Sequence, residues 1–401
     1  MTETTVIDPF TDPRTFELTA FGVPVRLIIG GRGRDEFAER VLYLWKRCDI
    51  REVTGVDVAA EFDGAVVRGV LDPDEAVHEA AWALDSVAAE TVEIAESVLT
   101  PAVTMAAITW ARGKKVMLHA GAIAHPETGR TAVLIGASGT GKTTATRTLA
   151  TQFGYVTDET VAVAADGSIQ SFAKPLALMP EDRAWGKRQH SPDEFNLLPA
   201  PAQLSLGALV LLTRDPEGPE VPVVRELSTI EALPLVGEHT SYFGELDQPL
   251  HEVAALIRSV GSVRHVTYRE AATLTDLVAE LLATPPVPAP PLLPVPPPLA
   301  ELDYDVEPFG RTIARRELRD FYVEDDGAAA MTLDGRVLAL SALAGRIMTL
   351  IGDTPTTLAP VAAALTDEFG EPPGDMDHQA MRLADDVVAD LVGSALLDHL
   401  D

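Results

Sequence analysis

The stretch Gly136-Ala-Ser-Gly-Thr-Gly-Lys142-Thr143 decides the fold of this 401-residue chain. It follows an apolar run, Thr131 to Ile135, and precedes a helix-compatible run, Thr144 to Phe153. Glycines at both ends of a four-residue spacer let successive backbone N–H groups turn inward around a phosphate, and a following helix adds its positive N-terminus. The pattern therefore predicts a nucleotide-binding phosphate loop between a strand and a helix.

The residues after the last glycine have separate tasks in such a loop. Lys142 would reach the β- and γ-phosphate oxygens, and Thr143 would hold Mg²⁺. ATP and Mg²⁺ are therefore the expected cofactors. The residues expected to contact the nucleotide are Gly136, Ala137, Ser138, Gly139, Thr140, Gly141, Lys142, Thr143 and Thr144.

Composition limits the partners and the compartment. Lys and Arg number 31 against 61 acidic residues, so the net charge of -30 would repel nucleic acid and an anionic membrane surface. The single cysteine, Cys48, excludes an intrachain disulfide and fits a reducing compartment. Met1 to Asp12 lacks the pattern of a signal peptide, and no stretch approaches the ~18 apolar residues of a spanning helix. We expect a cytoplasmic protein without nucleic-acid or membrane partners; a homo-oligomer is compatible with the sequence.

The clearest boundary lies at Thr284 to Ala300, where nine prolines fall between Pro285 and Pro298. Such a run favours an extended spacer of ~3.1 Å per residue, with a docking motif for an aromatic groove as the alternative. Four parts follow: an N-terminal α/β region over 1–110, a P-loop domain over 111–283, a proline-rich linker over 284–300 and a C-terminal domain over 301–401.

Further polar motifs surround the loop. The segment Gly154-Tyr-Val-Thr-Asp158-Glu159 places an acidic pair sixteen residues after Lys142, before the strand-like run Val161 to Ala164. Ahead of the loop, Met117 to Ala124 reads as a strand that carries His119. Beyond the acidic pair stands Phe172-Ala-Lys174-Pro175.

This set of motifs resembles the HPr serine kinase family, which shares an atypical P-loop fold with phosphoenolpyruvate carboxykinases. The resemblance covers roughly residues 111 to 240. It implies that Asp158 takes the proton from an acceptor hydroxyl, that His119 lines the same site and that Glu159 stands near Mg²⁺, where the family usually has a second aspartate. The family's second signature, which supports phosphorolysis of the product, has no convincing match, so reversal of the reaction is not implied.

The chemistry of phosphoryl transfer agrees with these roles. The lysine of the loop, its amides and Mg²⁺ would neutralise charge, and a carboxylate would orient the acceptor. Alternatives remain for single residues: Asp158 could be a turn residue, His119 a core polar group and Lys174 a solvated side chain rather than a phosphate contact. Arg214 or Arg225 could add a cation, and spacing does not choose between them.

The last hundred residues predict a small winged-helix-like α+β module, in which Asp334-Gly335 signals a hairpin. The expected elements are strands over 321–323, 328–333 and 336–340 and helices over 341–351, 357–369 and 377–400. Residues 301 to 401 hold 21 acidic residues against 7 arginines and no lysine, which argues against DNA binding by this module.

The run from Asp334 to Ser341, the Gly345-Arg-Ile that follows it and a last helix ending Gly393-Ser-Ala-Leu-Leu resemble the PqqD family over nearly all of residues 318 to 398. That resemblance implies recognition of the leader region of a ribosomally made precursor peptide, which adds as a strand along the sheet. The same positions could equally be hairpin core and solvated helix face. The residues expected to bind the peptide are Arg336, Val337, Leu338, Ala339, Leu340, Met381 and Asp385.

Together these patterns predict an α/β protein with kinase activity: an ATP-dependent enzyme that phosphorylates a serine or threonine hydroxyl of a precursor peptide. One alternative is a kinase of a free small molecule, such as an amino acid or a sugar. Another is a non-catalytic, ATP-gated peptide-binding protein. A carboxykinase-type decarboxylase would need a further metal-ligand pattern that the sequence lacks.

Overall fold

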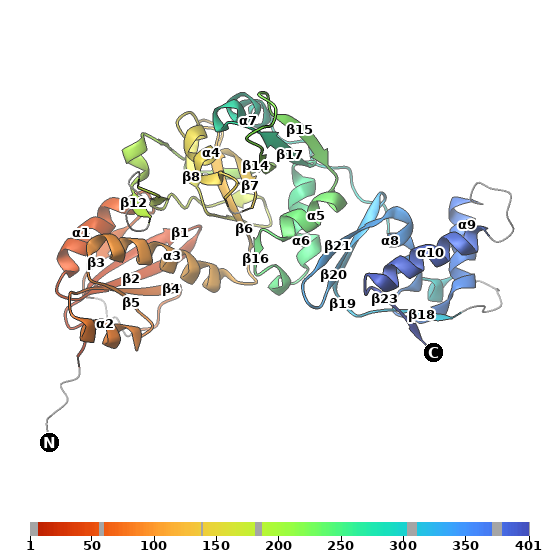
Figure 1. Ribbon diagram of the computed structural model, residues 1–401, viewed down its shortest axis with the longest axis horizontal. Helices are drawn as coiled ribbons and strands as arrows, with labels where there is room; N and C mark the ends of the chain where they lie inside the picture. The colour runs from red at the N-terminus through yellow and green to blue at the C-terminus, as the bar shows by residue number, and fades with distance from the viewer. Residues whose placement is uncertain are drawn as a thin grey trace, which may run out of the picture. The chain divides into compact units, whose positions relative to one another are not determined.

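The computed structural model describes residues 7–55, 60–137, 139–180, 187–302, 311–370 and 379–400. The fold is mixed α/β with several sheets, and the chain divides into two compact units (Figure 1). The first unit holds residues 1–226, 239–242 and 263–287, and the second holds 227–238, 243–262 and 288–401. Helices α5 (Thr229–Gly237) and α6 (Pro249–Ser259) therefore belong to the same unit as the C-terminal residues.

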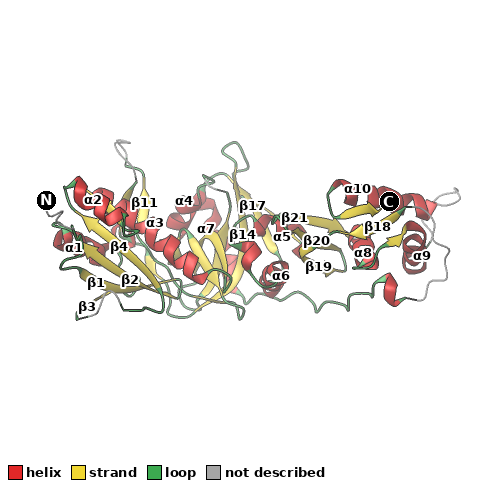
Figure 2. Cartoon of the chain, turned by 90° about the horizontal axis from the view of Figure 1, so that it is seen from below, coloured by secondary structure: helices red, strands yellow, loops and turns green. Residues whose placement is uncertain are grey.

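The first unit begins with a five-stranded sheet in the order β3-β1-β2-β4-β5. Its strands are β1 (Arg14–Ala20), β2 (Val23–Gly30), β3 (Arg51–Val53), β4 (Ala65–Leu71) and β5 (Val87–Ala89). Helices α1 (Arg34–Leu44) and α3 (Val92–Ala111) pack on this sheet (Figure 2), and α2 (Glu75–Trp82) packs against β5. Strands β1 and β2 pair antiparallel across the turn at Phe21-Gly22.

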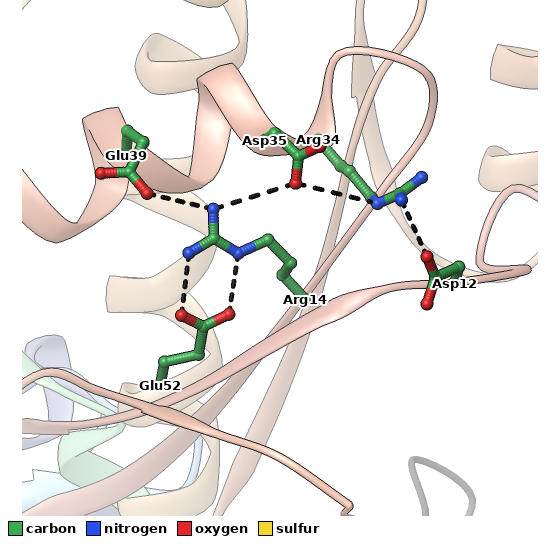
Figure 3. A network of polar contacts seen from close by, with 6 residues as sticks. All are labelled: Asp12, Arg14, Arg34, Asp35, Glu39 and Glu52. Atoms are coloured by element: carbon green, nitrogen blue, oxygen red, sulfur yellow. Dashed lines mark hydrogen bonds and ion pairs between the residues drawn. The ribbon is translucent and has the colours of Figure 1, made fainter.

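A network of ion pairs connects β1, β3 and α1 (Figure 3). Arg14 donates to both carboxylate oxygens of Glu52, over 2.7 and 2.8 Å, and to Glu39 over 3.1 Å. Arg34, at the start of α1, donates to Asp12 over 2.8 Å. Because these carboxylates are partly or largely exposed, the network adds little net stability and mainly fixes where α1 lies on the sheet.

Helix α3 corrects one expectation. Among the described residues, α3 is the one helix that is long enough and apolar enough to cross a membrane, by length and composition alone. The sequence was expected to contain no such stretch. Half of its apolar window is buried inside the protein, and its buried Glu96 accepts a hydrogen bond from Arg40 of α1 at 2.5 Å. Helix α3 thus packs as a core helix of the first sheet, and the cytoplasmic location stays a prediction.

The second sheet of the first unit carries the phosphate loop. Its ten strands follow the order β13-β8-β6-β9-β10-β14-β17-β15, with β7 between β14 and β6 and with β16 on β6. Strands β7, β14 and β17 run parallel, and helices α4 (Lys142–Leu149) and α7 (Leu274–Ala283) share their core. The strands are β6 (Val116–Ala124), β7 (Arg130–Ile135), β8 (Gly154–Thr157), β9 (Thr160–Val163), β10 (Ser168–Ile169), β13 (Leu198–Pro199), β14 (Leu204–Arg214), β15 (Val223–Leu227), β16 (Thr240–Ser241) and β17 (Val263–Tyr268).

A small antiparallel sheet, β19-β20-β21, forms the centre of the second unit. Its strands are β19 (Leu318–Glu324), β20 (Gly327–Thr332) and β21 (Val337–Ser341). A Cβ on Gly327 would lie 3.4 Å from Ile230 of α5, whereas the Cβ of Ala328 faces Gly345 of α8 (Ala342–Ile351). Successive residues of a strand point to opposite faces, so β20 is covered on both sides. The small residues of β20 permit this close packing.

The remaining elements of the second unit correct the expected C-terminus. Strand β18 (Thr312–Arg315) pairs with β22 (Thr356–Thr357) and with β23 (Leu397–Leu400). The helices expected over 341–351 and 357–369 are confirmed by α8 and α9 (Leu358–Phe369). The helix expected over 377–400 is wrong in its last part: α10 (Gln379–Gly393) ends early, Ala395 adopts a left-handed φ of 61°, and the chain continues as β23. Residues 377 and 378 lie outside the described ranges.

The proline-rich segment, residues 284–300, is in contact with the rest of the second unit at two points. No strand or α-helix is described over 284–300, which agrees with an extended segment, until the short turn η4 (Leu299–Glu301). Within the second unit, however, the Ala289 N–H donates to the Arg258 carbonyl at 2.7 Å, and Arg346 donates to the Pro297 carbonyl at 3.3 Å. The segment therefore packs on α6 and α8.

Candidate nucleotide site

The phosphate loop lies where the sequence predicts it, between β7 and α4. Gly139 and Gly141 adopt left-handed φ angles of 84° and 85°, which glycine reaches without strain. A Cβ on Gly136 would lie 2.9 Å from the Leu212 carbonyl of the neighbouring strand β14, closer than side chains tolerate. Ser138 lies outside the described residues. Each of these three glycines is thus required by the backbone itself.

Lys142 folds back over the loop that it ends. Its Nζ donates to the carbonyl oxygens of Gly136, at 2.5 Å, and Ala137, at 3.1 Å. The side chain is buried, and burial lowers the pKa of Lys142. Phosphate oxygens in the loop would replace these carbonyls as partners and favour the charged ammonium.

Tyr268 and Arg214 support the loop from the ends of two parallel strands, at paired positions of β17 and β14. The Tyr268 hydroxyl donates to the Thr140 carbonyl at 3.1 Å. A Cβ on Gly141 would lie 3.4 Å from that hydroxyl and 3.6 Å from Cδ of Arg214. The sequence spacing did not decide whether Arg214 or Arg225 adds a cation to the loop. The structure brings Arg214 to the loop and places Arg225 on β15. The sequence signal for Tyr268 was weak, because strand pairing alone brings it here.

The acidic pair follows β8 and contacts a buried lysine. The Nζ of Lys174 lies 3.0 Å from Asp158 Oδ1 and 3.0 Å from Glu159 Oε2, and the Tyr155 hydroxyl donates to Asp158 at 3.1 Å. Burial would lower the pKa of Lys174, but the two carboxylates outweigh it and raise that pKa above its usual range. Lys174 is only 2% exposed, so the interpretation of a solvated side chain beside Pro175 was wrong.

His119 lies in the electrostatic neighbourhood of the loop. Its side chain is exposed on β6, so it is not the core polar group that the sequence allowed. Partial desolvation and the Lys142 ammonium lower the pKa of His119, while Glu159 and Asp158 act in the opposite direction. The structure thus brings the three expected catalytic residues, Asp158, His119 and Lys142, into one region of the first unit; their roles stay predictions.

The oxygen atoms at this site suit Mg²⁺. Thr143 offers a hydroxyl in the first turn of α4, and Glu159 offers a carboxylate of which one oxygen already contacts Lys174. Mg²⁺ usually keeps water and phosphate ligands and needs few protein atoms. The described residues contain no group of three or more His, Cys, Asp and Glu side chains that could hold a metal ion by themselves. Residues Thr143 and Glu159 would hold the ion together with the phosphates.

The residues expected to bind a peptide lie in two places in the second unit. Val337 to Leu340 belong to β21, which in the described part of the chain pairs with β20 alone and so has a free edge. Arg336 precedes this strand and donates to the Ser394 carbonyl at 3.2 Å, near the end of α10.

Met381 and Asp385 lie near the start of α10 instead. They line a cavity of about 510 Å³ together with Ile313 of β18 and His399 of β23. No residue of β21 lines this cavity. The structure therefore does not join the two predicted parts into one pocket.

No protein-family model and no curated protein matches this chain. Among solved structures, the "Structure of the Hpr(Ser) kinase/phosphatase from Coxiella burnetii" is similar to part of it. The identity is 13%, the match covers 42% of this chain and 93% of that chain, and the TM-score is 0.22. At this score the likeness carries no argument about activity, so the functional reasoning below depends on the site itself.

Proposed function

We propose that this chain is an ATP-dependent kinase that phosphorylates a serine or threonine hydroxyl of a precursor peptide. The observation that carries the proposal is the phosphate loop, with Lys142 Nζ folded onto the Gly136 and Ala137 carbonyls. His119 lies close enough to be influenced by the charges of both Lys142 and the acidic pair. Loop amides, Lys142 and the N-terminus of α4 would hold the phosphates of ATP, and Mg²⁺ would neutralise their developing charge. Arg214 would add a cation at the Gly141 end of the loop.

Asp158 would orient the acceptor hydroxyl and take its proton. Lys174 and Tyr155 hold this carboxylate by contacts of 3.0 and 3.1 Å, which fixes its position before substrate arrives. Positioning counts for more than base strength in phosphoryl transfer, because the transition state is loose and needs little covalent help. His119, at the rim, would line the acceptor side.

The peptide would bind the second unit at the edge of β21. Helices α5 and α8 cover the two faces of the small sheet, so an extended peptide can join it by backbone pairing at an edge. Hydrogen exchange tests this directly. Adding the precursor should protect amides of Val337–Ser341, and protection confined to α10 would contradict strand addition.

Activity is tested by incubating the full chain with ATP, Mg²⁺ and a candidate precursor peptide from a neighbouring gene, read by mass. The proposal expects one added phosphate on a serine or threonine of the peptide, and none when Lys142 is replaced by Ala. Turnover of ATP that requires a free amino acid or a sugar, with the peptide unmodified, would instead identify a small-molecule kinase.

The second candidate is an ATP-gated peptide-binding protein. It is favoured by the ion pairs that already occupy Asp158, which is 7% exposed. In that case ATP would change the affinity for the peptide, but no phosphate would be transferred even at long incubation.

A further inference from the structure

The peptide group between Thr140 and Gly141 has two orientations open to it within the phosphate loop. Gly141 adopts a φ of 85°, and a half turn of this peptide would take that angle to about −95°. Glycine adopts both values without strain, so the residue that lets the loop curve also permits the turned form. In the turned form the Thr140 carbonyl would point where the Gly141 N–H points now, because the two groups lie on opposite sides of a trans peptide.

The orientation of this peptide matters for binding an anion. A phosphate in such a loop is held by backbone N–H groups, and a carbonyl oxygen in the place of one of them would repel it. The Gly141 N–H donates to no acceptor in the described part of the chain, so it is available to a ligand. The turned form would remove that donor.

Tyr268, at the end of β17, holds the Thr140 carbonyl. Its hydroxyl donates to that oxygen at 3.1 Å. The ring is 1% exposed and belongs to the core that α4 shares with β17, so packing fixes the position of the hydroxyl. Burial raises the pKa of Tyr268 above its ordinary value, so the hydroxyl keeps its proton at neutral pH and remains a donor.

The other hydrogen bonds of the loop do not reach the Thr140 carbonyl. The Thr140 N–H and hydroxyl both donate to the Ala137 carbonyl, at 3.4 and 2.7 Å, and Lys142 Nζ donates to the same oxygen at 3.1 Å. The backbone bonding of α4 begins one residue later, where the Ala145 N–H donates to the Gly141 carbonyl at 2.8 Å. Among the residues that the structure describes, Tyr268 is therefore the one donor to the Thr140 carbonyl.

We propose that Tyr268 is a positioning residue for nucleotide binding, whose hydroxyl keeps the Thr140–Gly141 peptide in the orientation that leaves the Gly141 N–H to the phosphates. This inference rests on the proposed binding of ATP by the loop, but it does not depend on which hydroxyl accepts the phosphate. Tyr268 would act through the loop backbone, so it would contribute to nucleotide affinity.

The substitution Tyr268→Phe tests the proposal, because it removes the hydroxyl and keeps the buried ring. Calorimetry on the full chain, with Mg²⁺ and ADP as the probe, should show a Kd raised by about 5- to 10-fold, the effect of one net hydrogen bond. Tyr43→Phe on α1 also removes one hydroxyl and should leave the Kd unchanged. Thermal melts would first establish that both variants are folded.

The NMR signal of the Gly141 amide separates peptide orientation from a general loosening of the loop. In the unchanged protein, ADP should move this amide proton downfield as a charge-assisted hydrogen bond forms. In free Tyr268→Phe the same signal should broaden or double, because two orientations of the peptide are then populated.

Two results would overturn this inference alone. One is ADP binding by Tyr268→Phe as tight as in the unchanged protein, and the other is weaker binding with a Gly141 signal that matches the unchanged protein. Failure of the unchanged protein to bind ADP would overturn the proposed nucleotide site together with it.

Discussion

The ammonium of Lys174 lies 3.0 Å from the carboxylate of Asp158, and both side chains are almost fully buried. A buried ion pair is stable only while both partners are present, because either charge alone would be desolvated without compensation. Lys174 therefore determines how the acidic pair is held.

Replacing Lys174 by Met should leave Asp158 buried and unpaired. We expect the free energy of unfolding, measured by urea denaturation, to fall by about 3–5 kcal/mol. The double variant Lys174→Met, Asp158→Asn is the control for charge, and it should recover part of the loss. If both variants lost the same stability, packing of the lysine stem would be the cause rather than the unpaired carboxylate.

Replacing Lys142 by Ala should remove most phosphoryl transfer, since the cation on the transferring phosphate is lost while the backbone loop remains. Losses of this kind reach ~10² or more in rate. Single-turnover phosphorylation measures the effect, and the exposed Lys114→Ala serves as a control. A normal rate in the Lys142 variant would place the nucleotide elsewhere.

Asp158→Asn separates chemistry from binding, because the side chain keeps its shape but loses its charge. We expect ATP affinity to stay within a few-fold of the original while transfer to the hydroxyl falls by ~10² to 10⁴. Asp166→Asn, in an exposed turn, should change neither quantity. Parallel loss of ATP binding and transfer would indicate that Asp158 mainly holds the metal ion.

The pH dependence of His119 follows from its lowered pKa. The unfolded chain has the ordinary value of 6.5, so as the pH falls below 6.5 the unfolded state binds protons first and stability decreases toward the folded pKa. Above pH 6.5 the contribution of the neutral His119 ring to the stability of the fold is fully present. In NMR titrations the ring should titrate below 6.5, and Lys142→Met should raise its midpoint by removing a neighbouring positive charge. A midpoint above 6.5 in the unchanged protein contradicts this.

Truncation at the proline-rich segment tests whether α5 and α6 fold together with the C-terminal residues. A chain that ends at Val287 would lose the sheet β19-β20-β21, and buried residues such as Ile230 of α5 would become exposed. We therefore expect a lower melting temperature and binding of an apolar dye. A truncated chain as stable as the full one, without dye binding, would mean that α5 and α6 need no C-terminal partner.

Local patterns made part of this structure predictable. The loop from Gly136 to Thr143 could be located because its glycines, lysine and flanking apolar strand act within a dozen residues. The hairpin at Asp334-Gly335 was equally local. Both elements are present as expected.

Long-range contacts account for the rest. The burial of Lys174 depends on two carboxylates brought by another segment, so its sequence neighbours did not reveal it. The apolar spacing of α10 continued to Leu400, and only the pairing of β23 with β18 shows that the last residues form a strand. Helices α5 and α6 looked like parts of the P-loop domain because nothing near them in sequence identifies their partner sheet.

The order of elements in the second unit matters during synthesis. Helices α5 and α6 leave the ribosome before β19, β20 and β21, although these strands supply the surface on which the helices pack. At ~5–20 residues per second, the residues between Ser262 and Ser341 take roughly ten seconds to make. During that interval the apolar faces of both helices stay exposed, because the strands on which they pack have not yet been made. The nascent chain would therefore be a target for chaperones until Ser341 has been synthesised.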